Sequence, residues 1–544
     1  MLKLRREPTS SSAVMDRSEK TLTVSLIVTV GIAAALMVLY ATVWGPWAGS
    51  DSVEYLEAAR NLAGGQGLVT IRASGAIEPL YARPPLYPVL LASTIRLGVD
   101  PIASVRWLNV ALIVALIGVV GASFYRATAR RMAPVLACLF LLTDVAVLDS
   151  FTGLMTEPLF ILIVTGQLVS LAAYLANRKA WTLWLSAVLA GLALLTRYAG
   201  AACVLVLAVA VVGWGEGTLG KRVRLAMAAS LVAALPFLIW TGSLLAQGDT
   251  PGVYRLDLAT LRQAFGSARV SLLNAVWGWF PWLQPAMTFA YRVRLALTAV
   301  FLAAGAGALL WFARKRGDLA GRGAPGTLLL GVVFAAFSLV HAGVVSLAYV
   351  LVEFPRPALN ERVLLPSHVT FVLGLVLLGW YLLSPLASQR PASILILVLI
   401  VPLVLPSIRP ARALLAALHA DGRGYTGRAW DDLPILTRLD ELPRSAPLIT
   451  NDIDAVTFFA RRPAFRLPDF EERISAADWR RFGETRLRLA ERAFVEQDGY
   501  LVLFSSALGQ LGDLYGNQAQ ARLDSLVAGL KIVYEGSDGG IYTR

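Results

Sequence analysis

The chain has 544 residues, of which 57% are hydrophobic and only 16% are charged. Soluble domains are about half apolar and about a quarter charged, so this composition excludes a soluble globular protein. The apolar residues also come in nearly uncharged runs of about 20 residues, the length that crosses a hydrocarbon core of about 30 Å. The composition therefore predicts a polytopic α-helical membrane protein.

The net charge of +13 is not evidence for a nucleic-acid partner. Residues 409–544 contain 18 Lys and Arg against 19 Asp and Glu, so the C-terminal segment is close to neutral. The positive excess lies in the membrane part, mainly in short loops on one side. The tendency of such loops to stay in the cytoplasm explains this distribution better than nucleic-acid binding does.

Residues 1–20 are basic and polar and are expected to form a disordered cytoplasmic N-terminus. The run 21–43 is too long for a cleaved signal peptide and predicts a retained first span. Further apolar runs bring the total to about 11 transmembrane helices, within a membrane domain over 21–408: 107–125, 132–148, 158–176, 180–196, 198–214, 225–246, 295–313, 326–352, 363–383 and 391–408.

The loops between these spans differ in length and charge. One set is short and basic, which predicts a cytoplasmic location. The other set is long and mixed or acidic, which predicts outer loops at 44–106, 149–157, 247–294 and 353–362. An odd number of spans then places residues 409–544 on the outer side, opposite the N-terminus.

The C-terminal segment 409–544 has a different pattern. Short β-type runs at 447–452, 500–504, 531–534 and 540–542 alternate with helical stretches, including 514–530. Alternating strands and helices predict a small extracytoplasmic α/β domain.

Ionisable residues gather at the outer ends of the predicted spans. Such groups at membrane depth are costly and by default indicate a functional site. They occur in four places: the first outer loop (Asp51, Glu54, Glu78 and Arg83), the second outer loop (Asp149 and Glu157), the end of the span 180–196 (Arg197 and Tyr198) and the stretch before the span 363–383 (Glu353, Arg356, Glu361 and Arg362).

Simpler structural roles are open for each of these residues. Asp51, with Glu54 three residues later, fits a helix cap, and Glu157 before Pro158 fits a helix start. Arg83 and Arg362 could anchor the chain to lipid headgroups. Asp144 is expected to be a polar group satisfied inside the bundle, and His341 and His368 core or interface histidines rather than metal ligands.

Several motifs resemble the GT-C superfamily of membrane glycosyltransferases, especially its protein mannosyltransferase and lipid A aminoarabinose transferase branch. The resemblance covers about residues 20–410 and depends on the order and spacing of the motifs, since no single one is decisive. The matching segments are Asp51-Ser-Val-Glu-Tyr55, Tyr81-Ala-Arg83-Pro84-Pro85-Leu-Tyr87-Pro88, Met155-Thr-Glu157-Pro158-Leu-Phe, Leu194-Leu-Thr-Arg197 and Glu361-Arg362-Val-Leu-Leu-Pro366.

The resemblance implies roles for individual residues. The first-loop acid Asp51 would be the catalytic base, Glu157 a second catalytic acid, and Arg83 a ligand of the donor phosphate. Aminoarabinose transferases carry a glutamate just before that basic residue, where this chain has Ala82. No cofactor is therefore certain, and a divalent metal is left open. The other residues expected to bind substrate are Tyr55, Glu78, Tyr81, Arg197 and Arg362.

The function implied is transfer of a sugar from a polyprenyl-phosphate donor to a lipid, glycan or protein acceptor. The reaction would take place at the outer face of the cell inner membrane, among membrane lipid, as an inverting single displacement. A transporter or flippase of lipid-linked intermediates is the alternative, but transporters place ionisable groups near the midplane and often show inverted repeats. A non-catalytic membrane scaffold is a third interpretation.

Overall fold

The computed structural model describes residues 10–246, 261–279, 326–352, 359–383, 390–467 and 484–544, with a few single residues between 296 and 307. These residues form two compact units. We call the first the bundle unit; it comprises residues 1–43, 81–87 and 105–420. We call the second the sheet unit; it comprises residues 44–80, 88–104 and 421–544.

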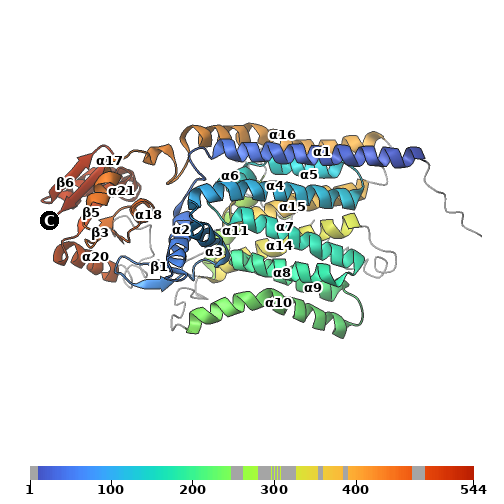
Figure 1. Cartoon of the computed structure of the whole chain (residues 1–544), viewed down its shortest axis with the longest axis horizontal. Coiled ribbons are helices and arrows are strands. Elements are labelled where there is room, and N and C mark those ends of the chain that lie inside the picture. Colours follow the sequence, from blue (N-terminus) through green and yellow to red (C-terminus); the bar gives the residue numbers. More distant parts are fainter. Residues whose placement is uncertain are drawn as a thin grey trace, which may run out of the picture. The chain divides into compact units, whose positions relative to one another are not determined.

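Long helices that run side by side make up most of the bundle unit (Figure 1). Their bounds in chain order are α1 (Ser10–Ala41), α4 (Pro101–Thr128), α5 (Met132–Thr143), α6 (Val145–Phe151), α7 (Glu157–Asn177), α8 (Ala180–Thr196), α9 (Ala201–Trp214), α10 (Leu219–Ala246), α11 (Leu261–Gly278), α14 (Gly326–Leu351), α15 (Leu365–Leu383) and α16 (Arg390–Asp421).

The prediction of a polytopic helical membrane protein is confirmed. Among the described residues, six helices are long and apolar enough to cross a membrane, namely α1, α4, α7, α10, α14 and α15. The pair α5 and α6, bent by 65°, would be a seventh span, and residues 180–196 and 198–214 are shorter apolar helices. The expected span 295–313 lies almost entirely outside the described residues. Helix α16, which contains the last expected span (391–408), continues to Asp421, beyond the expected end at residue 408.

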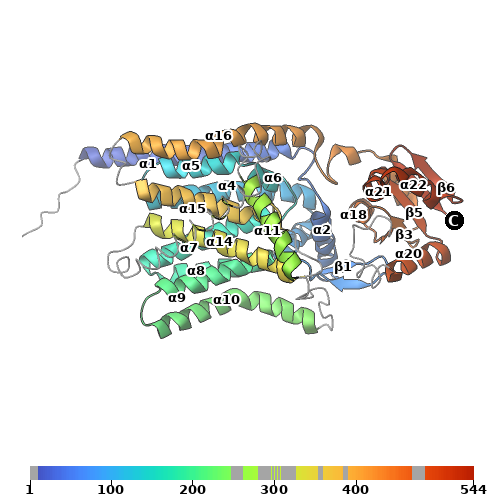
Figure 2. The same cartoon turned by 180° about the vertical axis from the view of Figure 1, so that it is seen from behind.

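Small residues allow the helices of the bundle unit to approach closely. A Cβ atom on Gly191 of α8 would lie 2.7 Å from the backbone oxygen of Ala233 in α10. A Cβ atom on Gly374 of α15 would lie 3.3 Å from the backbone nitrogen of Ala335 in α14. Close backbone contact at glycine is a common way for helices to associate in lipid. Helix α11 packs against α14 at a steep angle (Figure 2).

The bend between α5 and α6 is stabilised by Asp144. One carboxylate oxygen accepts a hydrogen bond from Val147 N at 3.0 Å and so caps α6. The other carboxylate oxygen lies 2.8 Å from Nε2 of His368 in α15. Both side chains are buried, so Asp144 is satisfied inside the bundle and His368 is a core residue.

The sheet unit contains a five-stranded sheet in the order β4-β3-β5-β7-β6. Strands β4, β3 and β5 are parallel to one another. Strand β7 pairs antiparallel with β5 on one side and with β6 on the other. This confirms the predicted C-terminal α/β fold. The strands are β3 (Leu448–Thr450), β4 (Phe465–Arg466), β5 (Tyr500–Phe504), β6 (Lys531–Gly536) and β7 (Gly539–Thr543).

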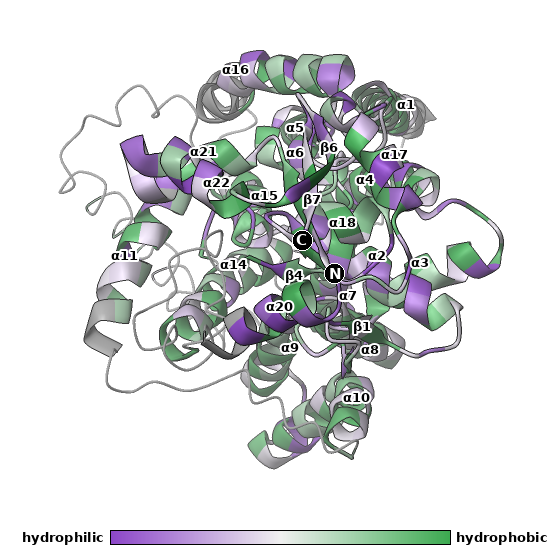
Figure 3. Cartoon of the chain, turned by 90° about the vertical axis from the view of Figure 1, so that its left-hand side faces the viewer, coloured by the Kyte–Doolittle hydropathy of each residue, from purple (hydrophilic) through white to green (hydrophobic). Residues whose placement is uncertain are grey.

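Helices cover both faces of this sheet, and hydrophilic residues lie along two of them, α17 and α20 (Figure 3). Val502 and Ile541 are buried on one face, and Leu501 and Leu503 on the other. The expected single helix 514–530 is instead divided near Gly516, which has a φ of +56°. The helices are α17 (Pro434–Glu441), α18 (Ile453–Phe459), α20 (Glu484–Glu496), α21 (Ala507–Tyr515) and α22 (Ala519–Val527).

The sheet unit also includes most of the first long loop. This loop forms α2 (Ser50–Ala63), the antiparallel strands β1 (Val69–Ile71) and β2 (Ile77–Pro79), and α3 (Leu86–Arg96). The sheet unit includes α2, both strands and most of α3. Residues 81–87 of the same loop belong to the bundle unit. The residues expected to form the site are therefore divided between the two units.

Candidate functional site

Glu157 is the central residue of a polar cluster in the bundle unit. It begins α7, follows the N-cap residue Thr156 and precedes Pro158, so it does occupy a helix start. Proline is favoured in the first turn of a helix because a backbone N–H there would have no intrahelical acceptor, so its absence in proline costs no hydrogen bond. The side chain of Glu157 is only 1% exposed. A carboxylate so deeply buried requires positive partners.

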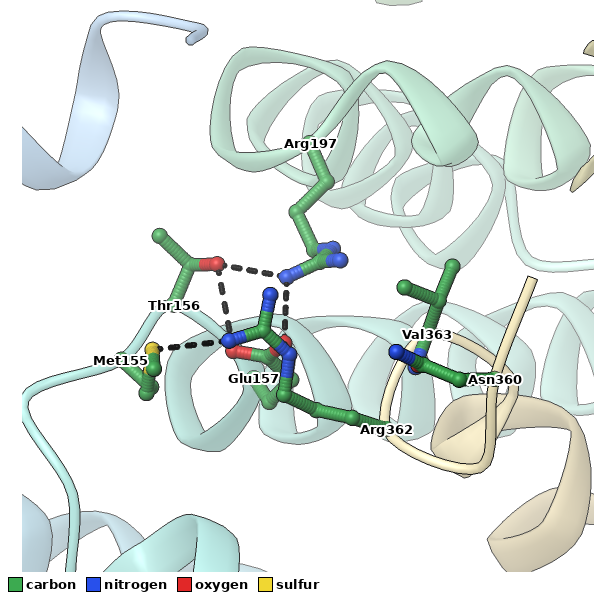
Figure 4. Close-up of polar contacts among 7 residues, drawn as sticks. All are labelled: Met155, Thr156, Glu157, Arg197, Asn360, Arg362 and Val363. Atoms are coloured by element: carbon green, nitrogen blue, oxygen red, sulfur yellow. Dashed lines mark hydrogen bonds and ion pairs between the residues drawn. The ribbon is translucent and has the colours of Figure 1, made fainter. Parts of the chain in front are cut away.

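Two arginines from other helix ends supply those partners (Figure 4). Nη1 of Arg197, just after α8, lies 2.8 Å from Oε1 of Glu157. Nε of Arg362, before α15, lies 3.4 Å from the same oxygen. Arg197 also donates to Oγ1 of Thr156 at 2.8 Å, and Nη1 of Arg362 lies 3.5 Å from Sδ of Met155. The cluster thus joins the start of α7, the end of α8 and the start of α15.

The contacts of Oε1 are ion pairs and not aligned hydrogen bonds. Both guanidinium nitrogens are within ion-pair distance of Oε1, yet this buried oxygen accepts no hydrogen bond of good angle within the described part of the chain. The short distances show a buried electrostatic contact. Arg197 and Arg362 are 17% and 34% exposed, so part of each side chain is accessible from outside the cluster.

The segment that carries Arg83 is attached to this region by Tyr198. Tyr198 begins a 3-10 turn (Tyr198–Gly200) directly after Arg197, and its hydroxyl donates to the backbone oxygen of Tyr81. Arg83 is half-buried and precedes two buried prolines, Pro84 and Pro85. Because proline fixes its own φ and restricts the residue before it, this segment is stiff.

Asp51 lies in the first turn of α2, in the sheet unit. The helix begins at Ser50 with Gly49 as its N-cap, and Oγ of Ser52 accepts from the backbone nitrogen of Gly49 at 3.0 Å. The alternative in which Asp51 caps the helix together with Glu54 is therefore wrong. The helix starts earlier than that alternative requires, and a serine closes the first turn. Asp51 is half-buried at the positive end of the helix, which favours negative charge.

The structure places two other expected site residues in the sheet unit. Tyr55, one turn after Asp51, is buried with 4% of its surface exposed. Glu78 lies on β2 and forms an ion pair of 2.7 Å with Arg72. Tyr81, Arg83, Glu157, Arg197 and Arg362 belong to the bundle unit, and the geometry described above brings Glu157, Arg197 and Arg362 together.

Comparison with known proteins bears on the fold. No family model and no curated protein matches the sequence. Among solved structures, ArnT from Cupriavidus metallidurans in the apo state matches with a TM-score of 0.51 and 16% identity, over 95% of this chain and 97% of that one. The chain has the GT-C fold.

Two further structures with this fold match less well. ArnT from Cupriavidus metallidurans bound to undecaprenyl phosphate gives a TM-score of 0.48 and 18% identity over the same shares of the two chains. The oligosaccharyltransferase AglB from Archaeoglobus fulgidus, in complex with an inhibitory peptide and a dolichol phosphate, gives 0.48 and 12% identity. This chain covers 74% of AglB.

A metal ion is not supported by the described residues. Within the described part of this GT-C fold, no three His, Cys, Asp or Glu side chains are grouped so as to hold one. Ala82 also stands where the resemblance leads one to expect a glutamate. A divalent metal stays an expectation from the resemblance, and no step below depends on it.

Thr156 was not singled out from the sequence, and Tyr198 was named only as a polar neighbour of Arg197 at the outer end of its span, with no role assigned to it. Their contacts join positions far apart in the chain: Tyr198 and Tyr81 are 117 positions apart, and Arg197 and Thr156 are 41 positions apart. The one local signal was that each directly neighbours an expected residue. The backbone around Gly200 is compact, since a Cβ atom there would lie 2.4 Å from the carbonyl carbon of Ala193.

Proposed function

We propose that this protein is a glycosyltransferase that moves a sugar from a polyprenyl-phosphate donor to an acceptor hydroxyl. The observation that carries the proposal is the buried contact of Glu157 with Arg197 and Arg362. The GT-C fold and the motifs that resemble this superfamily support it. The acceptor, whether lipid, glycan or protein, is left open.

Arg197, Arg362 and Arg83 are the proposed ligands of the donor phosphate. When the glycosidic bond breaks, negative charge grows on the leaving phosphate. Guanidinium groups stabilise that charge, and they match a phosphate better than a point charge does. Glu157 neutralises part of the positive charge and holds two of these arginines in place, so we assign it a positioning role.

Asp51 is the proposed base. As the acceptor oxygen attacks the anomeric carbon, its proton passes to the carboxylate of Asp51. The bond from the anomeric carbon to the phosphate oxygen breaks, and its electron pair leaves with the phosphate. A single displacement of this kind inverts the anomeric configuration. Gly49 and Ser52, and not Asp51, cap the helix, and Asp51 lies in its first turn.

We further propose that the reaction occurs on the outer side of the cell inner membrane. The support is the charge of the loops: short basic loops on one side and long mixed loops on the other. Exposed Ser525 in α22 would then react, as Ser525→Cys, with an impermeant thiol reagent in intact cells. Labelling only after permeabilisation would reverse this orientation. The native cysteines, Cys138 and Cys203, are buried and give little background.

The test is turnover of a panel of polyprenyl-phosphate sugars by membranes that contain the protein and native acceptors. General base catalysis typically contributes about 10²–10⁴-fold in rate, so Asp51→Asn should lose at least about 10²-fold in transfer while expressing normally. Glu54→Gln is the matched control and should change little. If wild-type protein transfers no sugar, the proposed function is refuted. If Asp51→Asn transfers sugar as well as wild type, Asp51 is not the base.

A further inference from the structure

The segment just before α2 is held by the loop that follows α16, within the sheet unit. Ala48 forms an isolated parallel bridge with Gly424, and the backbone nitrogen of Tyr425 donates to Ala48 O at 2.9 Å. Oγ1 of Thr426 donates to Pro46 O at 2.9 Å. Ala48 is completely buried. The backbone that leads into α2 is therefore fixed by residues near position 425.

This contact is close and specific. Gly424 has a φ of +65°, and a Cβ atom there would lie 1.9 Å from Ala48 O, so only glycine fits. The guanidinium of Arg423 lies 4.2 Å from the ring centroid of Trp47, a cation–π contact that covers the same segment.

Helix α2 has a second attachment, to α18. The two helices pack together, and Oγ of Ser50 donates a hydrogen bond to Oδ2 of Asp454 in the first turn of α18. Ser50 is the first residue of α2 and the direct neighbour of Asp51. The contact thus holds the turn that carries the proposed base.

Tyr425 connects the two attachments. Its backbone nitrogen binds Ala48, while its hydroxyl donates to Oδ1 of Asp452 at 2.9 Å. Asp452 is the N-cap of α18 and accepts from Ala455 N at 2.9 Å. The loop at 425, the start of α18 and the start of α2 therefore form one hydrogen-bonded assembly.

We propose that the C-terminal α/β segment positions the catalytic base, with Ser50 and Asp454 as the positioning residues. The proposal rests on the function assigned above to Asp51. A displacement of about 1 Å in a reacting group can cost about 10²-fold in rate. Two attachments just before Asp51, at Ala48 and at Ser50, restrict such a displacement and give the C-terminal segment a role in positioning the base.

The first experiment measures turnover of a polyprenyl-phosphate sugar that the wild-type protein consumes. Ser50→Ala and Asp454→Ala should each lower kcat by about 10-fold to 10²-fold and change the donor KM less than about twofold. Ser50→Thr and Asp454→Asn keep a donor and an acceptor and should recover most of the rate. Glu441→Ala is the matched control, because Glu441 is an exposed acid of the same segment that pairs with Arg438. It should have wild-type kcat.

The second experiment measures hydrogen exchange of the α2 amides in the full chain and does not depend on activity. Exchange should be faster in Asp454→Ala than in wild type, and close to wild type in Asp454→Asn. If Asp51→Asn abolishes transfer while Ser50→Ala and Asp454→Ala keep wild-type kcat, positioning is refuted and the proposed function stands. If wild-type protein transfers no sugar, the catalytic role falls with the proposed function. Unchanged exchange in Asp454→Ala refutes the attachment itself.

Discussion

The hydroxyl of Tyr198 donates a hydrogen bond to the backbone oxygen of Tyr81. Tyr198 directly follows Arg197, and Tyr81 lies two residues before Arg83. One contact therefore links the segment of a proposed phosphate ligand to a member of the Glu157 cluster. The ring of Tyr198 also packs against Phe237 and Trp240 of α10, with centroid distances of 5.9 Å and 6.3 Å.

Tyr198→Phe should weaken use of the donor. The change removes the hydroxyl but keeps the ring contacts with Phe237 and Trp240, so the fold should be retained. A hydrogen bond contributes about 0.5–1.5 kcal/mol, which corresponds to about a 2-fold to 10-fold lower kcat/KM for the donor. Tyr174→Phe is the control, because Tyr174 lies near the end of α7, far along that helix from Glu157 at its start. It should have the donor kcat/KM of wild type. Equal kcat/KM values in all three proteins would show that the Tyr81 contact does not position Arg83.

Glu157→Gln tests whether Glu157 positions the arginines or acts as the base. The amide keeps the shape but removes the charge that faces Arg197 and Arg362, so donor kcat/KM should fall by about 10-fold to 10²-fold, as for loss of a charged contact of about 1.5–3 kcal/mol. The pH–rate profile separates the two roles. A base must be deprotonated, so the loss of rate at acidic pH should persist in Glu157→Gln. If that acidic limb disappears, Glu157 is the base.

Arg83→Ala should lower donor kcat/KM by about 10-fold to 10²-fold, because a hydrogen bond to a charged group contributes about 1.5–3 kcal/mol. Arg83→Lys should recover only part of this loss, since lysine lacks the two-pronged geometry of the guanidinium group. Arg96→Ala is the control from the same loop, as Arg96 is exposed and donates to Leu62 O. Similar small effects at both positions would remove Arg83 from the site.

Asp454→Asn should change the pH dependence of stability. Burial, followed by the nearby charges of Asp452 and Glu54, raises the pKa of Asp454, whereas the bond from Ser50 and the charge of Arg466 lower it. An acid with a raised pKa in the folded state contributes stability at low pH, and this contribution is lost as pH rises through the folded pKa.

Asparagine cannot ionise, so the melting temperature of Asp454→Asn relative to wild type should increase between about pH 4 and about pH 7. Thermal unfolding of the detergent-solubilised full chain measures this difference. Asp440→Asn, at an exposed acid of the same segment, is the control and should follow wild type. A difference between Asp454→Asn and wild type that stays constant with pH would contradict the raised pKa of Asp454.

Properties that depend on neighbouring residues could be predicted from the sequence. The apolar runs predicted helices such as α7 and α14 because the length of such a run and its lack of charge are local quantities. The alternation of strands and helices likewise predicted the C-terminal α/β fold. The resemblance to the GT-C superfamily, drawn from the order of the motifs, is confirmed for the fold.

Helix capping shows where local patterns are insufficient. Asp51 and Glu54 have the spacing of a capping box, yet Gly49 and Ser52 form the cap. The start of α2 is set by Ala48, which is held by Gly424 and Tyr425, more than 370 residues later in the chain. A local pattern contains no information about this contact.

The sequence by itself determined that Glu157, Arg197 and Arg362 lie at the ends of apolar helices, because charged residues interrupt or end such runs. Only the tertiary structure decided that these three ends meet, with both arginines on one oxygen of Glu157. Helix periodicity specifies which residues share a face, but not which helices become neighbours. That choice depends on side-chain packing over the whole bundle, such as the close approach at Gly191 and Gly374.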